Sequence, residues 1–196
     1  MGKVVQFPKQ ELEKFGYRPI RKRKKDDDGQ LNLFSECKIL SLTKNTPLEE
    51  AILLDEQNDA RAALMYKRAI EAGDHAADAY CNLGILESEK QHYSKAIDCF
   101  TKCLSEIPRH FEGHYNLANL YAETGNFPLA KIHYQIAIEI EPQFSDCYFN
   151  IALTLVMLRD IKEALIALQT YCSLVSHEAQ KPAEELIEKL TRTLLS

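Results

Sequence analysis

Apolar side chains recur at separations of three and four residues through much of residues 77–178. That spacing places them on one face of an α-helix. It occurs twice in every 34 residues, around the fourth to eleventh positions and again around the twentieth to twenty-eighth. Segments 77–110, 111–144 and 145–178 align with one another in this register. The pattern therefore predicts three successive helical hairpins, as in a repeat protein.

Small residues and prolines hold fixed positions in these units. The eighth and twentieth positions contain only glycine or alanine, which lets the two helix backbones approach where they cross. Gly125 stands where the middle unit turns between its helices, and a proline ends each of the first two units. In chain order the small residues and prolines are Gly84, Ala96, Pro108, Ala118, Ala130, Pro142, Ala152 and Ala164. Larger side chains also repeat at fixed positions: Tyr80, His114 and Tyr148 at the fourth, Leu83, Leu117 and Ile151 at the seventh, and Phe100, Tyr134 and Leu168 at the twenty-fourth.

With these residues the chain resembles the tetratricopeptide-repeat family, most completely over residues 77–144. The resemblance implies an all-α fold, a right-handed alpha-alpha superhelical solenoid in which the first helix of each unit lines a concave groove. We expect residues 46–76 to form a degenerate first repeat with a shorter or shifted first helix, since Glu49 and Glu50 replace a leucine and a small residue. Residues 179–196 are expected to form a C-terminal capping helix with Pro182 in its first turn.

Composition narrows the classes of protein that the chain can be. No apolar stretch approaches the roughly 18 residues of a spanning helix, and the start has no long apolar signal core, so we expect a cytoplasmic protein. The six cysteines lack the spacing of a disulfide framework and are expected to be reduced. The sequence contains no phosphate loop, glycine fingerprint or nucleophile elbow, so we predict neither an enzyme nor a cofactor.

The sixth position of each unit is an asparagine, in a register that the family resemblance directs into the groove. An amide both donates and accepts hydrogen bonds, so a ladder of asparagines can hold the backbone of an extended peptide. The alternative is a structural polar residue, because asparagine is common at this position in the family. We predict that the amides face solvent in the free protein. The ladder consists of Asn82, Asn116 and Asn150.

The other predicted groove residues are apolar, amide or acidic. Lysine and arginine are absent from the groove positions, which argues against a clamp for a C-terminal carboxylate. We therefore predict a protein-binding scaffold whose partner is a basic or apolar protein or peptide. Acids in a first helical turn also have a structural explanation, because the helix dipole favours them. The predicted groove residues besides the asparagine ladder are Tyr115, Asn119, Phe149, Leu153, Glu89 and Glu123, and the acids in first helical turns are Asp78, Glu112 and Asp146.

Two pairs of potential metal ligands, Cys99 with Cys103 and His110 with His114, have four-residue spacing. We predict no metal site, however, because Cys103 occupies a small core position and His114 replaces a core aromatic residue. The two pairs also fall on different helices around Pro108.

Residues 1–45 lack the repeat pattern and carry 11 Lys and Arg against 6 Asp and Glu, whereas residues 46–196 carry 13 against 23. A basic arm of net charge +5 thus precedes a body of net charge −10. We expect the arm to be largely disordered. Its basic run at residues 21–25 is a solvated tail, a nuclear address or a nucleic-acid contact, and the adjacent acids at residues 26–28 argue against nucleic acid.

A short segment of the arm, Gln30, Leu31, Asn32, Leu33 and Phe34, resembles the pentapeptide with which bacterial replication and repair proteins bind the sliding clamp. Such a peptide would place Gln30 in a polar pocket and Leu33 and Phe34 in an apolar one. The alternative function is therefore a replication or repair accessory protein. The competing interpretation is that the apolar side chains of this part of the arm dock onto the exposed first repeat. They are Leu31, Leu33, Phe34, Ile39 and Leu40.

Overall fold

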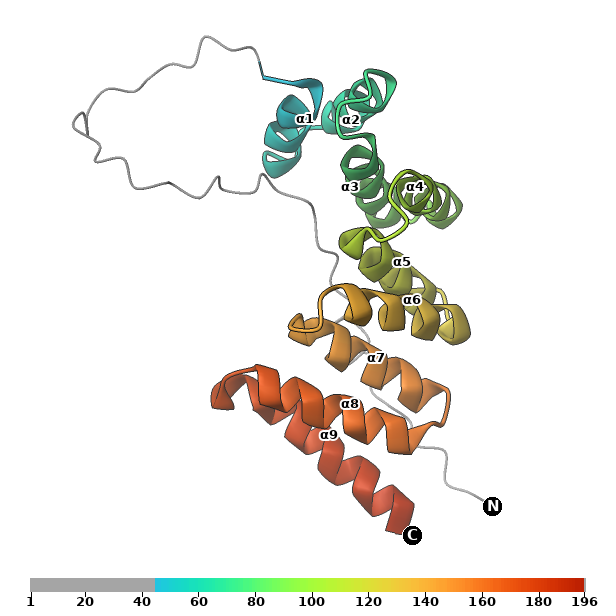
Figure 1. The fold of residues 1–196 in the computed structure, drawn as a ribbon, viewed down its shortest axis with the longest axis vertical. Helices are drawn as coiled ribbons and strands as arrows, with labels where there is room; N and C mark the ends of the chain where they lie inside the picture. The colour runs from blue at the N-terminus through green and yellow to red at the C-terminus, as the bar shows by residue number, and fades with distance from the viewer. Residues whose placement is uncertain (1–44, 196) are drawn as a thin grey trace, which may run out of the picture.

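The structure, a computed structural model, describes residues 45–195, and the side chains to residue 192. Within that range every regular element is an α-helix, which confirms the predicted all-α solenoid (Figure 1). The helices are α1 (Pro47–Glu56), α2 (Ala62–Glu71), α3 (Ala76–Glu89), α4 (Tyr93–Glu106), α5 (Phe111–Glu123), α6 (Phe127–Ile140), α7 (Ser145–Met157), α8 (Ile161–Leu174) and α9 (His177–Leu195).

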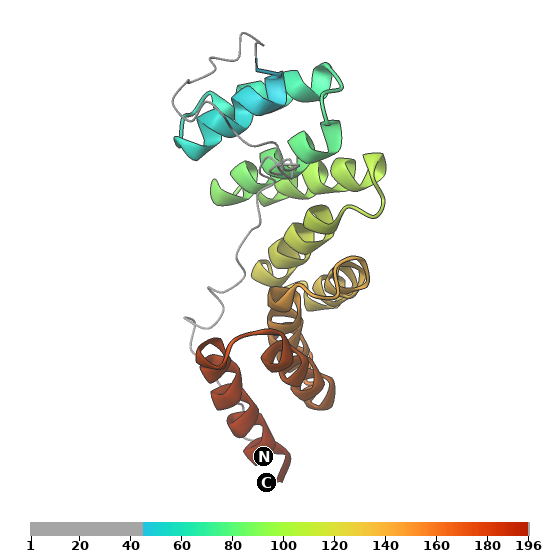
Figure 2. The same cartoon turned by 60° about the vertical axis from the view of Figure 1, so that its left-hand side comes forward.

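Consecutive helices pair as hairpins, and the hairpins stack along the long axis of the molecule (Figures 1 and 2). The second helix of one hairpin packs against the first helix of the next, and α9 packs against α8. In addition α5 contacts both α3 and α7, while no contact of that extent links α4 to α6 or α6 to α8. The first helices thus lie closer together than the second helices, as expected on the inside of a curved stack.

The two helices of the hairpin α3–α4 approach closely at Gly84. A Cβ atom at this position would lie 2.8 Å from Cε1 of Phe100, which is fully buried. The equivalent positions of the next two units hold Ala118 and Ala152, both with no exposed surface. Small residues are therefore required here because the opposing side chain fills the space that a larger one would need.

The first hairpin departs from the repeat at its beginning. Helix α1 has 10 residues against 14 in α3, so it is shorter, as the two glutamates predict. Glu49, one of them, completes a capping box with Thr46, and Pro47 begins the helix. The residue that interrupts the repeat pattern is therefore part of a helix start.

The last helix begins earlier than expected. Helix α9 starts at His177, so Pro182 lies inside it rather than in its first turn. The side-chain amide of Gln180 donates to the carbonyl oxygens of Cys172 and Val175, and this contact with the end of α8 holds the added turn. Ala183, Leu186 and Leu190 are buried in the same core cluster as α8, which α9 covers.

Candidate interaction surface

The first and second helices of the hairpins differ sharply in charge. Helices α1, α3, α5 and α7 contain acidic residues and no lysine or arginine, whereas α2, α4, α6 and α8 contain both signs. The acids of the first helices are Glu49, Glu50, Asp55, Glu56, Asp78, Glu87, Glu89, Glu112, Glu123 and Asp146. The Asp, Glu, Lys and Arg side chains of the first helices are therefore all negative, and we call the exposed surface of these helices the first-helix face. Glu87 lies apart from it, in a pocket that it lines with Lys67, Lys95 and Lys102 of the second helices.

The asparagine ladder does not face solvent, and that prediction is wrong. Asn82, Asn116 and Asn150 are 1%, 0% and 2% exposed. The amide of Asn150 donates to the hydroxyl of Tyr115 and to Oδ1 of Asn119, at 3.2 Å each.

The other two ladder residues also bond to the preceding unit. Asn116 donates to Sγ of Cys81 at 3.5 Å, and Asn82 is hydrogen-bonded to the hydroxyl of Tyr66. Each ladder residue thus ties one first helix to the unit before it, because successive units stack at this position.

The remaining predicted groove residues separate into two groups. Tyr115, Asn119, Phe149 and Leu153 are buried, at 8% exposure or less. Tyr134 donates from its hydroxyl to Oδ1 of Asn119 at 2.5 Å, which connects this residue to the second helix of its own unit. Tyr115 and Asn119 also accept from Asn150 of the following unit, so they contribute to packing between units, which the spacing within one unit does not reveal.

Glu89 and Glu123 are the predicted groove residues that are exposed. They end α3 and α5 at equivalent positions 34 residues apart. Partial burial, with the negative charge of Asp55 adding to it, raises the pKa of Glu89 above its ordinary value. Glu123 accepts a hydrogen bond from the hydroxyl of Tyr93 at 3.1 Å. The two carboxylates can thus attract a cation on one side of the first-helix face.

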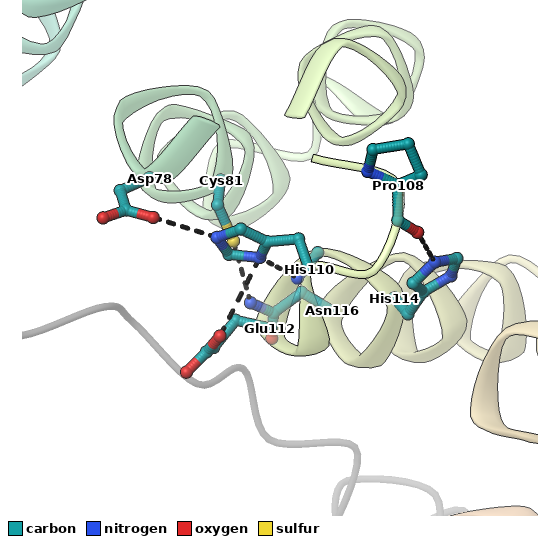
Figure 3. A network of polar contacts seen from close by, with 8 residues as sticks. Asp78, Cys81, Pro108, His110, Glu112, His114 and Asn116 are labelled. Carbon is teal, nitrogen blue, oxygen red and sulfur yellow. Dashed lines mark hydrogen bonds and ion pairs between the residues drawn. The ribbon is translucent and has the colours of Figure 1, made fainter. Parts of the chain in front are cut away.

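At the opposite ends of these helices, a polar network surrounds His110, the N-cap residue of α5 (Figure 3). Its Nδ1 accepts the amide hydrogen of Gly113 at 3.0 Å, so the ring proton is on Nε2. Nε2 lies 2.9 Å from Oδ1 of Asp78, which is therefore the acceptor. Glu112 is close to the same ring, with Oε2 3.8 Å from Nδ1.

Four residues were considered above as metal ligands and rejected. Of these, His114 makes contacts different from those of His110. Nε2 of His114 donates to the carbonyl oxygen of Pro108 at 2.9 Å, and Nδ1 contacts Nδ1 of His133 at the same distance. Cys99 is half-buried, and burial raises the pKa of its thiol to about 11.

Cys103 and His110 do come together, with Cys81 as a third member. Their placement on different helices, which argued against a site, does not keep them apart. The sequence signal was the repeat register, since the fifth, twenty-seventh and thirty-fourth positions of a unit meet in the fold.

The basic run and the segment Gln30–Phe34 lie outside the described residues, so the interpretations attached to them stay predictions. Among residues 45–195 no helix combines the length and apolarity needed to cross a membrane.

The stacked hairpins define a helical repeat protein with an acidic inner layer. Two family models, both described as tetratricopeptide repeat, match residues 77–110 and 111–144. Residues 77–144 therefore contain two tetratricopeptide repeats.

Curated relatives contain a similar stretch within much longer chains. The BBSome complex member BBS4 homolog of Drosophila melanogaster is 26% identical over 125 residues, 63% of this chain and 26% of the relative. Tetratricopeptide repeat-containing protein trd-1 of Caenorhabditis elegans is 25% identical over 168 residues, 84% of this chain and 21% of that protein. Anaphase-promoting complex subunit 3 of Schizosaccharomyces pombe is 29% identical over 119 residues, covering 61% of this chain and 18% of the relative. The chain thus spans about a quarter or less of these proteins.

Solved structures share the fold. The first TPR of Spaghetti (RPAP3), bound to the HSP90 peptide SRMEEVD, has a TM-score of 0.57 at 21% identity and covers 61% of this chain and 94% of its own. YrrB, a TPR protein with an unusual peptide-binding site, has a TM-score of 0.64 at 23% identity and covers 75% of this chain and 77% of its own.

Proposed function

We propose that the protein is a non-catalytic scaffold that binds a basic, extended segment of a partner protein along its first-helix face. The observation that carries this proposal is the separation of charge between layers: the first helices hold ten acids and no lysine or arginine. A surface of one sign attracts and orients a partner of the other sign. The solved peptide complex of a similar fold supports a peptide as the kind of ligand.

Charge attraction of this kind gives modest affinity and strong salt dependence. An exposed ion pair contributes about 0.2–1 kcal/mol, and salt at physiological strength screens charges beyond about 8 Å. Two carboxylates in equivalent positions can pair with two cations on one extended strand. The partner's apolar side chains would supply the rest of the binding energy, since Met157 at the end of α7 remains 40% exposed.

The test compares two layers of the same molecule. The variant Glu89→Gln/Glu123→Gln removes two charges from the first-helix face, and glutamine keeps an acceptor for the Tyr93 hydroxyl. The matched control, Glu106→Gln/Glu139→Gln, removes two exposed charges from α4 and α6. The probe is a fluorescent peptide of alternating lysine and leucine, with an alternating glutamate and leucine peptide as its counterpart.

We expect the first variant to weaken binding of the lysine peptide about three- to tenfold at low salt, as the loss of two ion pairs predicts. The control variant should bind as the wild type does. Equal weakening by both variants would show that the peptide responds to net charge alone, and this would contradict binding at the first-helix face.

The sliding-clamp interpretation remains a separate prediction, because its residues lie outside the described range. A pull-down with purified bacterial clamp decides it. Recovery of the clamp by the wild type and its loss on Phe34→Ala would support a replication or repair accessory protein, whereas no recovery would exclude this reading.

A further inference from the structure

Three potential metal ligands converge where α3, α4 and the start of α5 meet. Cys81 lies in α3, Cys103 in α4, and His110 caps α5. Their ligand atoms all lie within 4.8 Å of one another. The two thiols have no exposed surface and the imidazole is 7% exposed, so the cluster is enclosed by protein.

The surroundings hold the three side chains in place. Asp78 accepts from Nε2 of His110, so Nδ1, which accepts the amide hydrogen of Gly113, is the ring nitrogen that remains for a metal. Asn116 donates to Sγ of Cys81 at 3.5 Å, the kind of contact that stabilises a thiolate (Figure 3). A Cβ atom at Gly113 would lie 3.0 Å from Sγ of Cys103 and 3.4 Å from Nδ1 of His110, so a larger residue would crowd both groups.

The same place in the next unit shows that the fold does not require such ligands. The equivalent positions there hold Tyr115, Ala137 and Phe144. The rings of Tyr115 and Phe144 pack edge to face with their centres 5.2 Å apart. An apolar cluster therefore fills this position in one unit, whereas two thiols and an imidazole fill it in the unit before.

The chemistry of the three donors fits a thiophilic metal. Thiolate sulfur binds zinc at about 2.3 Å and imidazole nitrogen at about 2.0–2.1 Å, which puts neighbouring ligand atoms roughly 3.5–4 Å apart. Ligand atoms 4.8 Å apart would need to approach by roughly 0.8–1.3 Å to reach that spacing. A metal-bound histidine also usually donates its other N–H to a carboxylate, and Asp78 is placed to accept it.

We infer that Cys81, Cys103 and His110 form a binding site for one thiophilic d10 metal ion, Zn²⁺ or Cu⁺. Cu⁺ accepts the three donors as a trigonal set. Zn²⁺ favours a fourth ligand, and Glu112, whose Oε2 lies 3.8 Å from Nδ1 of His110, can supply a carboxylate oxygen. Binding releases the two thiol protons to solvent, and the amide of Gly113 gives up its bond to Nδ1.

The experiment uses the full chain, reduced and stripped of metal with a chelator. Titration with Co²⁺, a spectroscopic substitute for Zn²⁺, should produce thiolate-to-cobalt absorption that saturates at one ion per chain and disappears when Zn²⁺ is added. Competition with a Cu⁺-specific chelator measures the other candidate ion. Bound metal should also raise the melting temperature, because it binds the folded state.

Variants locate the site. Cys103→Ala introduces the residue that the next unit has at this position, Ala137, so the fold should tolerate it. It should abolish the cobalt band, while the matched control Cys172→Ala, in α8, should keep it. Asp78→Asn should weaken metal affinity about 10- to 100-fold, because it loses the carboxylate that orients His110.

Three results would overturn the site. They are the absence of both a cobalt band and Cu⁺ binding in the wild type, full retention of metal by Cys103→Ala, and a loss caused equally by Cys172→Ala. If Cys103→Ala fails to fold, as far-ultraviolet circular dichroism would show, the Asp78→Asn comparison decides the question. None of these outcomes depends on peptide binding, so the metal site and the proposed function can fail separately.

Discussion

The first and second helices of the hairpins differ in how much of their surface is buried, and the stacking of the hairpins causes this difference. In α5, 10 of 13 residues are buried, whereas in the adjacent α6 only 3 of 14 are. The same contrast separates α7 from α8. In these units the first helix lies between its own partner and the helices of neighbouring units, so little of it remains exposed. The exposed end of α5 is the acidic Glu123, whereas that of α7 is Met157.

The second helices are more exposed than the first helices and carry mixed charge. They expose apolar side chains at equivalent positions, such as Leu64, Ile132 and Ile166, and they carry charges of both signs. Because each second helix contacts fewer neighbours, substitutions there should change stability less than substitutions in the first helices. The first-helix face is thus the surface whose Asp, Glu, Lys and Arg residues are all negative, and the second helices form an outer layer of mixed charge.

The largest effect is expected where the two layers meet at Gly84. In Gly84→Leu the new side chain would collide with the buried ring of Phe100, since even a Cβ atom would lie 2.8 Å from it. We expect a loss of about 3 kcal/mol in unfolding free energy, measured by urea denaturation. The milder variant Gly84→Ala should also lose stability. Adding Phe100→Leu to it should restore part of that loss, because the unit 145–178 has Ala152 and Leu168 at these two positions. An unchanged stability in Gly84→Leu would contradict the close crossing.

The next effect tests whether the asparagine ladder belongs to the interior of the first layer. Asn150→Ala removes the donor to Tyr115 and Asn119 in a buried site. We expect a loss of about 2 kcal/mol in unfolding free energy, because buried polar groups are left with fewer partners. Gln135→Ala, on the exposed side of α6, is the control and should change stability little. If Asn150→Ala and Gln135→Ala change the unfolding free energy by similarly small amounts, the amide of Asn150 is not held in a buried network.

The sequence was sufficient to predict the hairpins of this protein but not the contacts between successive units. The 34-residue register was sufficient for the hairpins, because spacing within one helix defines its apolar face. Burial of Asn82, Asn116 and Asn150 depends on the next unit, and a polar residue with a regular spacing gives no sign of which neighbour it will meet. For the same reason the sequence analysis considered Cys103 and His110 only beside Cys99 and His114, discounted all four as metal ligands, and did not show that Cys81 lies next to Cys103 and His110.

A smaller, pH-dependent effect should arise at the contact between α5 and α6. His114 donates to Pro108 through Nε2, so its Nδ1 accepts from Nδ1 of His133. Burial and the neighbouring ring lower the pKa of His133 from 6.5 to about 4, and burial also lowers that of His114. The unfolded chain therefore binds more protons than the folded one between these values, and stability falls as the pH drops through this window.

Between about pH 7 and pH 5 this contact should lose about 1 kcal/mol, a figure reduced for its partial exposure to solvent. His133→Gln keeps a donor to His114 and cannot be protonated, so its unfolding free energy should fall less over the same range. Parallel pH profiles for the variant and the wild type would show that other groups control acid sensitivity.

The smallest effect concerns the first-helix face and the basic arm. Residues 1–45 carry a net charge of +5 and are tethered to a body of net charge −10, which gives the arm a high effective concentration at any acidic surface within reach. About 20 residues separate the basic run from α1, and a flexible chain of that length spans roughly 25 Å. We expect deletion of residues 1–28 to tighten binding of the lysine and leucine peptide about two- to fivefold at low salt and less at high salt, since screening weakens exposed charge pairs. Replacing residues 21–25 with glutamine in the full chain is the matched control, because it removes the charge and retains the length. Equal affinity of the full chain and the deletion at low salt would show that the arm does not compete for the first-helix face.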